Sequence, residues 1–178
     1  MKRSDFLKAG AGLGAMTFIS NLSIGANTPN HVISDTARII RNEHGKTLNV
    51  LGDKMTLKLT SKDTGGRFAL IEQNNEPGVS IPLHVHENED EIFKVIQGQL
   101  EVQVADETWT LNPGDLAFCP RGVPHTWKVT GEENAKVDLS FFPAGLEEMF
   151  DELAQLPEGP PDFDVIAKIT GRYGVNFL

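Results

Sequence analysis

The sequence is poor in cysteine and in positive charge. Cys119 is its one cysteine, so neither an intramolecular disulfide nor a zinc site made of several cysteines can form. We expect Cys119 to be a small buried hydrophobic side chain, and a reactive thiol beside a metal is the alternative. The formal net charge of −9 argues against a nucleic-acid partner and against an anionic membrane surface, because both need a basic face.

The N-terminal apolar run is too short and too polar to cross a bilayer, but it has the order of an export signal. A basic start, Lys2-Arg3, precedes a weakly apolar run over 9–19, and small residues lead up to Ala26. We therefore predict a signal peptide over 1–26, and an N-terminal tail that is never cleaved is the alternative.

The basic start also bears on the export route. Residues 3–8 resemble the twin-arginine export signal, with Ser4 in place of the second arginine. We expect an exported, periplasmic protein, and both the Sec and the twin-arginine routes stay open. The polar residues 27–35 are predicted to be a linker between the signal and the folded domain.

The rest of the chain is long enough for one domain with a hydrophobic core. Residues 36–143 alternate between short apolar or β-branched runs and turns that are rich in glycine and proline, a pattern typical of a β-sandwich or β-barrel. The predicted strands are 50–51, 55–59, 68–71, 79–81, 92–96, 100–104, 108–111, 116–119, 125–129 and 137–141.

The C-terminal part changes from strand to helix spacing. Residues 144–156 and 162–172 each place apolar side chains at helical intervals, and the proline-rich segment 157–161 separates them. We predict that 144–178 is a helical extension that packs on the outside of the barrel.

Two histidines and a glutamate stand out in the segment from Gly78 to Gly98. His84 and His86 share one face of a strand, because successive side chains on a strand point to opposite faces. Two imidazoles side by side can coordinate one metal ion. Glu91 follows after a short polar turn and is a candidate for a further ligand.

A third histidine, His125, lies far along the sequence and could face the same interior from a neighbouring strand. Three imidazoles and one carboxylate suit a divalent transition metal: Fe, Mn, Ni, Co, Cu or Zn. Four protein ligands leave coordination positions open for water, O₂ or a chelating substrate. A polar core cluster that holds no metal is the alternative.

These segments resemble the two motifs of the cupin family. The first motif, G-x5-H-x-H-x4-E-x6-G, fits at every defined position from Gly78 to Gly98. The second, G-x5-P-x-G-x2-H-x3-N, fits from Gly114 to His125 and departs at Val129, which stands in place of asparagine. The family's asparagine is not a metal ligand, so this departure concerns the turn and not the metal.

The resemblance implies an all-β fold, an antiparallel jelly-roll β-barrel with C-terminal helices, and one metal on His84, His86, Glu91 and His125. The C-terminal tail is also similar to the ending of small cupins that are likened to quercetin 2,3-dioxygenase. Cupins are often dimers, so we expect a homodimer.

Several residues near the motifs have two interpretations. Glu89 and Asp90 fit the family spacing less well than Glu91, and we expect them to face solvent. Phe93 and Trp127 share strand faces with ligand residues, so they are candidates for lining a substrate pocket, although plain core is the alternative.

The complete ligand set favours an enzyme. The hypothesis is a metal-dependent dioxygenase that acts on a small chelating substrate, flavonol-like or diketone-like, with Glu91 as the catalytic base. The alternatives are a non-catalytic cupin that binds a small ligand or metal, and a redox-neutral isomerase or cyclase. We expect a small-molecule substrate, no nucleic acid, and no membrane association after the signal is cleaved.

Overall fold

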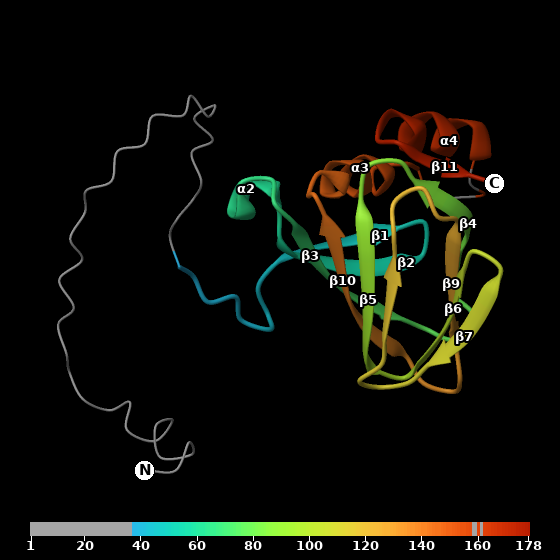
Figure 1. Ribbon diagram of the computed structural model, residues 1–178. Helices are drawn as coiled ribbons and strands as arrows, with labels where there is room; N and C mark the ends of the chain where they lie inside the picture. Colours follow the sequence, from blue (N-terminus) through green and yellow to red (C-terminus); the bar gives the residue numbers. More distant parts are fainter. Residues whose placement is uncertain (1–36, 158–159, 161) are drawn as a thin grey trace, which may run out of the picture. The chain divides into compact units, whose positions relative to one another are not determined.

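The computed structural model describes residues 37–157, 160 and 162–178. These residues form two antiparallel sheets that face each other, with helices at one end of the barrel (Figure 1). This confirms the predicted all-β, antiparallel jelly-roll barrel with C-terminal helices. The predicted signal peptide, 1–26, and the predicted linker, 27–35, lie outside the described residues.

The larger sheet has six strands in the order β1-β2-β3-β10-β5-β8. Its order shows that β10, from late in the chain, lies between β3 and β5. The bounds are β1 (Lys46–Val50), β2 (Asp53–Leu59), β3 (Ala69–Asn75), β10 (Ala135–Phe142), β5 (Asp90–Gln97) and β8 (Leu116–Cys119).

The smaller sheet has five strands in the order β11-β4-β9-β6-β7. The pairing of β4 with β9 brings the two motif segments together, since it joins strands about forty residues apart in the sequence. The bounds are β11 (Val175–Phe177), β4 (Ser80–His86), β9 (His125–Thr130), β6 (Gln99–Val104) and β7 (Glu107–Leu111).

The core lies between the sheets because the strands alternate buried and exposed side chains. Strand β10 shows this most clearly, with every second residue buried and polar or partly exposed residues between them. The buried side chains on β10 are Ala135, Val137, Leu139 and Phe141.

The predicted helices are present as α3 (Leu146–Leu153) and α4 (Phe163–Arg172). Their apolar faces are buried, and Asp162 caps the N-terminus of α4, where its carboxylate accepts hydrogen bonds from the backbone N–H groups of two residues in the first turn. Figure 1 shows both helices at the end of the barrel where β11 lies. No helix in the described part of the chain has the length and apolar character needed to cross a bilayer.

Three local elements differ from the prediction. Leu51 was expected in a strand, but it has a φ of 55° and lies in the tight turn between β1 and β2. The four-residue helix α2 (Ser61–Thr64) and the three-residue strand β11 were not predicted. Both are too short to show a periodic pattern, and β11 exists because its backbone pairs with β4.

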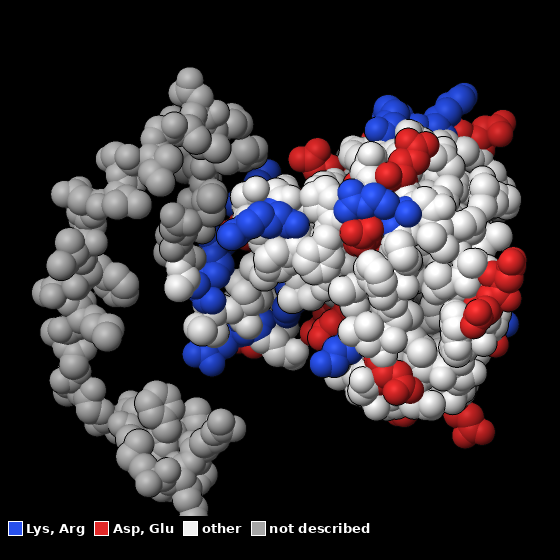
Figure 2. All heavy atoms as spheres, viewed as in Figure 1, with Lys and Arg blue, Asp and Glu red and all other residues white. Residues whose placement is uncertain are grey.

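The outer face of the larger sheet carries both charged and apolar side chains. Asp138 of β10 lies opposite Lys94 of β5, and Figure 2 shows the charged side chains as separate groups on a largely uncharged surface. Several exposed side chains on β10, β5 and β8 are apolar: Ile96, Leu116, Phe118 and Phe142.

The tight turn from β5 to β6 yields a stability prediction. Gly98 has a φ of +74°, and a Cβ there would lie 2.5 Å from the backbone O of Asn134. Gly114 has a φ of +98°, and a Cβ there would meet nothing within 4 Å. Both alanine substitutions incur the cost of a left-handed conformation, about 1–2 kcal/mol, but only Gly98→Ala adds a backbone clash.

We therefore expect Gly98→Ala to lower the free energy of unfolding by about 1–3 kcal/mol more than Gly114→Ala. Urea denaturation of the two variants beside the wild type measures the difference. Equal losses in the two variants would show that the close approach to Asn134 does not constrain this turn.

Candidate metal centre

The four motif residues come together inside the barrel. His84 and His86 lie on β4, Glu91 on β5 and His125 on β9, and all four side chains are buried. Backbone pairing places His84 directly opposite His125. One ligand atom of each residue lies within 4.8 Å of those of the other three, so the cluster could hold a metal ion.

Glu91 lies closest to two of the imidazoles. Its Oε2 is 2.7 Å from Nε2 of His125 and 3.7 Å from Nε2 of His86. The ring centroids of the three histidines lie 4.4 to 5.1 Å apart. The Nε2 atoms of His86 and His125 therefore face the same carboxylate oxygen, as two ligands of one metal would.

Backbone carbonyls fix the orientation of two of the rings. Nδ1 of His84 lies 2.9 Å from the carbonyl O of Pro82, and Nδ1 of His125 lies 3.0 Å from that of Val123. A carbonyl only accepts hydrogen bonds, so each Nδ1 must carry the proton. The Nε2 lone pair of each ring is then the one available to a metal.

The protonation of the cluster suits a cation. Burial, together with the neighbouring imidazoles, lowers the pKa of His84 to about 4 and that of His86 to about 3. Both rings are therefore neutral at physiological pH, which is the form that binds metal.

His125 and Glu91 share a proton. Burial raises the pKa of the Glu91 carboxyl. Burial alone would lower the pKa of His125, but the hydrogen bond to Glu91, the charge of Glu91 and the hydrogen bond to the carbonyl of Val123 together outweigh burial and raise that pKa. A divalent metal between the ligands would replace this shared proton and neutralise the buried carboxylate, so the donor set fits a metal ion.

The space beside the ligands is small. A cavity of about 30 Å³ is lined by His84, His86, Glu91 and Trp127, which is room for about one water molecule. Side chains of α3 and β11 close it, namely Met149, Phe150 and Val175.

The two predicted pocket residues occupy different places. Trp127 lines the cavity beside the ligands. Phe93 is fully buried and packs its ring against His125, with ring centroids 6.3 Å apart in an edge-on arrangement. Trp127 is therefore placed to touch a bound molecule, whereas Phe93 supports a ligand from behind.

The motifs did not reveal a polar group that lines the same cavity. Asp53 accepts hydrogen bonds from Nε2 of Gln73 at 2.7 Å and from Nδ2 of Asn75 at 2.6 Å. Burial raises the pKa of Asp53 to about 6. Asp53 follows a glycine in an apparent turn, so no motif indicates that its side chain points inward.

The expectation that Glu89 faces solvent is wrong. Glu89 is buried, and burial raises its pKa to about 7. The reason is strand alternation, because Glu89 is two residues before Glu91 and so points to the same side of the chain. Asp90 points the other way and is partly exposed, where it pairs with Arg121 at 2.9 Å.

The single cysteine is a core residue, as expected. Cys119 is fully buried opposite Glu91 in the pairing of β5 with β8. Burial, aided by the charge of Glu91, raises the pKa of the thiol to about 12, so the thiol stays protonated and unreactive.

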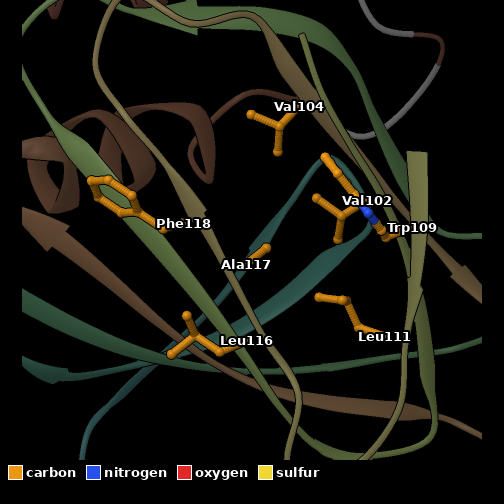
Figure 3. Close-up of a pocket in the computed structure, with 7 residues that line it drawn as sticks. All are labelled: Val102, Val104, Trp109, Leu111, Leu116, Ala117 and Phe118. Atoms are coloured by element: carbon orange, nitrogen blue, oxygen red, sulfur yellow. The ribbon is translucent and has the colours of Figure 1, made fainter. Parts of the chain in front are cut away.

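A second and wider cavity lies away from the ligands. It has a volume of about 300 Å³, and Figure 3 shows the seven apolar side chains that line it. They come from β6 and from β7 and β8, the last strands of the two sheets: Val102, Val104, Trp109, Leu111, Leu116, Ala117 and Phe118. None of the four motif ligands lines this cavity.

The shared proton yields a prediction about metal binding. At pH 8 we expect one Co²⁺ to displace no more than about one proton, because His84 and His86 are already neutral and only a proton between His125 and Glu91 can leave. Isothermal titration calorimetry in buffers of different ionisation enthalpy measures this number. Release of two or more protons would contradict the neutral state assigned to His84 and His86.

Comparison with known proteins agrees with the motifs. The family model of the cupin domain matches residues 72–142. Quercetin 2,3-dioxygenase of Bacillus subtilis is 32% identical over 85 residues, which cover 48% of this chain and 25% of that protein. The chain spans about a quarter of the length of the curated relatives that it matches.

Solved structures support the fold. KdgF from Halomonas sp. matches with a TM-score of 0.56 and 23% identity, over 64% of this chain and 99% of that one. The polyketide cyclase RemF from Streptomyces resistomycificus matches with a TM-score of 0.51 and 27% identity, over 62% of this chain and 81% of that one. The chain therefore carries a cupin domain on a jelly-roll barrel, and in sequence it resembles quercetin 2,3-dioxygenase-like cupins.

Proposed function

We propose that this chain is a metal-dependent oxidoreductase of the dioxygenase type. The observation that carries the proposal is the buried set of three histidines and one glutamate whose ligand atoms converge on one point. The similarity to quercetin 2,3-dioxygenase supports this choice among the activities that a cupin can have. The proposed substrate is a small molecule that chelates through adjacent hydroxyl and carbonyl oxygens, such as a flavonol or a 1,3-diketone.

The proposed cofactor is one divalent transition metal: Fe, Mn, Ni, Co, Cu or Zn. His84, His86 and His125 would hold it through Nε2, and Glu91 through a carboxylate oxygen. The metal would supply a Lewis acid with open coordination positions for the substrate and O₂.

Glu91 is the proposed catalytic base. Its carboxylate is fully buried, and burial raises its pKa, so it accepts a proton more readily than an exposed glutamate does. In the proposed step, the Glu91 carboxylate moves off the metal and accepts the proton of the substrate hydroxyl.

The size of the metal cavity limits how a substrate can bind. A flavonol is far larger than a cavity of about 30 Å³, so its entry requires that the side chains closing the cavity move aside. Met149 and Phe150 on α3 and Val175 on β11 are these side chains. Once they move, Trp127 offers an aromatic face to a planar substrate.

A redox-neutral cyclase is the second candidate. The structural likeness to the polyketide cyclase RemF favours it, because the same fold there carries a cyclase name. Both candidates could use Glu91 as a base, but only the dioxygenase consumes O₂. Oxygen uptake therefore separates them.

The first test is metal content followed by oxygen uptake. We expect elemental mass spectrometry to find about one equivalent of a transition metal in the wild type and much less in His84→Ala. The metal-loaded protein should then consume O₂ in proportion to the amount of flavonol or 1,3-diketone that is lost. Substrate loss without O₂ uptake would favour the cyclase, and no turnover with any loaded metal would count against an enzyme.

A second test isolates the role of Glu91. We expect Glu91→Gln to lower kcat by about 100-fold or more, because the amide can still approach the metal but cannot accept the substrate proton. Glu107→Gln, at an exposed position on β7, is the control and should leave kcat unchanged. A Glu91→Gln variant that keeps both its metal and its kcat would rule out the base role.

A further inference from the structure

His86 differs from the other two histidines in what its Nδ1 atom faces. His84 and His125 each direct Nδ1 to a backbone carbonyl. Nδ1 of His86 is buried and has no hydrogen-bond partner. This ring therefore lacks the contact that fixes the orientation of the other two.

The missing partner lies close by. Oε2 of Glu89 is also buried without a hydrogen-bond partner, and no other side-chain atom in the described part of the chain shares this condition. The two atoms are 3.8 Å apart, and the side chains of His86 and Glu89 are only 5% and 8% exposed. Leaving a buried polar atom unpaired is unfavourable, so two such atoms that face each other indicate a hydrogen bond that forms when Nε2 of His86 binds a metal.

We propose that Glu89 is a positioning residue for the metal ligand His86. Its carboxylate accepts a hydrogen bond from Nδ1–H of His86 when Nε2 of that ring binds the metal. The inference rests on the proposed metal site, and it assigns a role to a residue that the cupin motifs do not mark.

The chemistry of imidazole requires such an acceptor. When a metal occupies Nε2, the ring proton must sit on Nδ1, and in a buried site that N–H needs an oxygen to accept it. A carboxylate does this best, because it holds the ring orientation and makes Nε2 a stronger donor to the metal.

No neighbouring side chain makes a hydrogen bond to Oε2 of Glu89, so this oxygen can accept one from His86. The nearby guanidinium of Arg121 makes its side-chain hydrogen bonds to Asp90, at 3.0 and 2.9 Å, and to the carbonyl of Phe142. The ring of His86 is stacked on Phe141, with centroids 5.8 Å apart and planes 10° apart. Phe141 therefore packs against the flat face of the His86 ring, while the Nδ1 atom at the edge of the ring faces Glu89.

Metal affinity tests this role without an activity assay. We would titrate Co²⁺ against a competing chelator in the wild type, Glu89→Ala, Glu89→Gln and the exposed control Glu107→Gln. We expect Glu89→Ala to weaken Co²⁺ binding by about 10- to 100-fold. Glu89→Gln should weaken it less, because the amide oxygen still accepts from Nδ1–H, and the control should match the wild type.

The outcomes separate this inference from the metal proposal. If the wild type binds no Co²⁺, the proposed metal site fails and the role of Glu89 falls with it. If the wild type binds Co²⁺ and both Glu89 variants bind within about twofold of it, only the role of Glu89 is overturned. If Glu89→Ala does not fold, Glu89→Leu decides the question in its place, because it fills the buried position but has no oxygen to accept the hydrogen bond.

Discussion

The burial of one carboxylate among three imidazoles is the constraint on which the rest of this structure depends. An ionised carboxylate away from water is unfavourable unless a cation or a proton compensates it. In Glu91 the compensation comes from the proton shared with His125 at 2.7 Å, in a place where a divalent metal would fit. His84 and His86 stay neutral because burial and their neighbours oppose a second positive charge. The four side chains therefore accommodate one cation at a time, either the proton shared by Glu91 and His125 or a metal ion in its place.

The scaffold supplies what this cluster needs. The pairing of β4 with β9 sets His84 against His125, and backbone carbonyls orient both rings. Phe93 and Phe141 support rings from the core, and the C-terminal α3 and β11 close the cavity on the remaining side. The C-terminal segment is therefore part of the site, because it sets how much room a bound molecule has beside the ligands.

The sequence predicted the four-residue cluster from one local signal and one resemblance. Strand alternation places His84 and His86 on one face, and the resemblance to the cupin motifs adds Glu91 and His125, although His125 reaches the site only through the pairing of β4 with β9. The same alternation places Glu89 on the inner face with Glu91, whereas the motif spacing marks only Glu91. The inward position of Asp53 and the strand β11 were beyond prediction, because each depends on contacts between segments far apart in the sequence. The predicted homodimer stays a prediction.

The proposed metal site lies among His84, His86, Glu91 and His125. Anomalous diffraction from crystals of the metal-loaded protein, recorded on both sides of the metal's absorption edge, tests it most directly. We predict a single strong anomalous peak within about 2.0–2.3 Å of Nε2 of each histidine and of a Glu91 oxygen. A loaded protein whose anomalous peak lies elsewhere, or which shows none at these residues, would contradict the account.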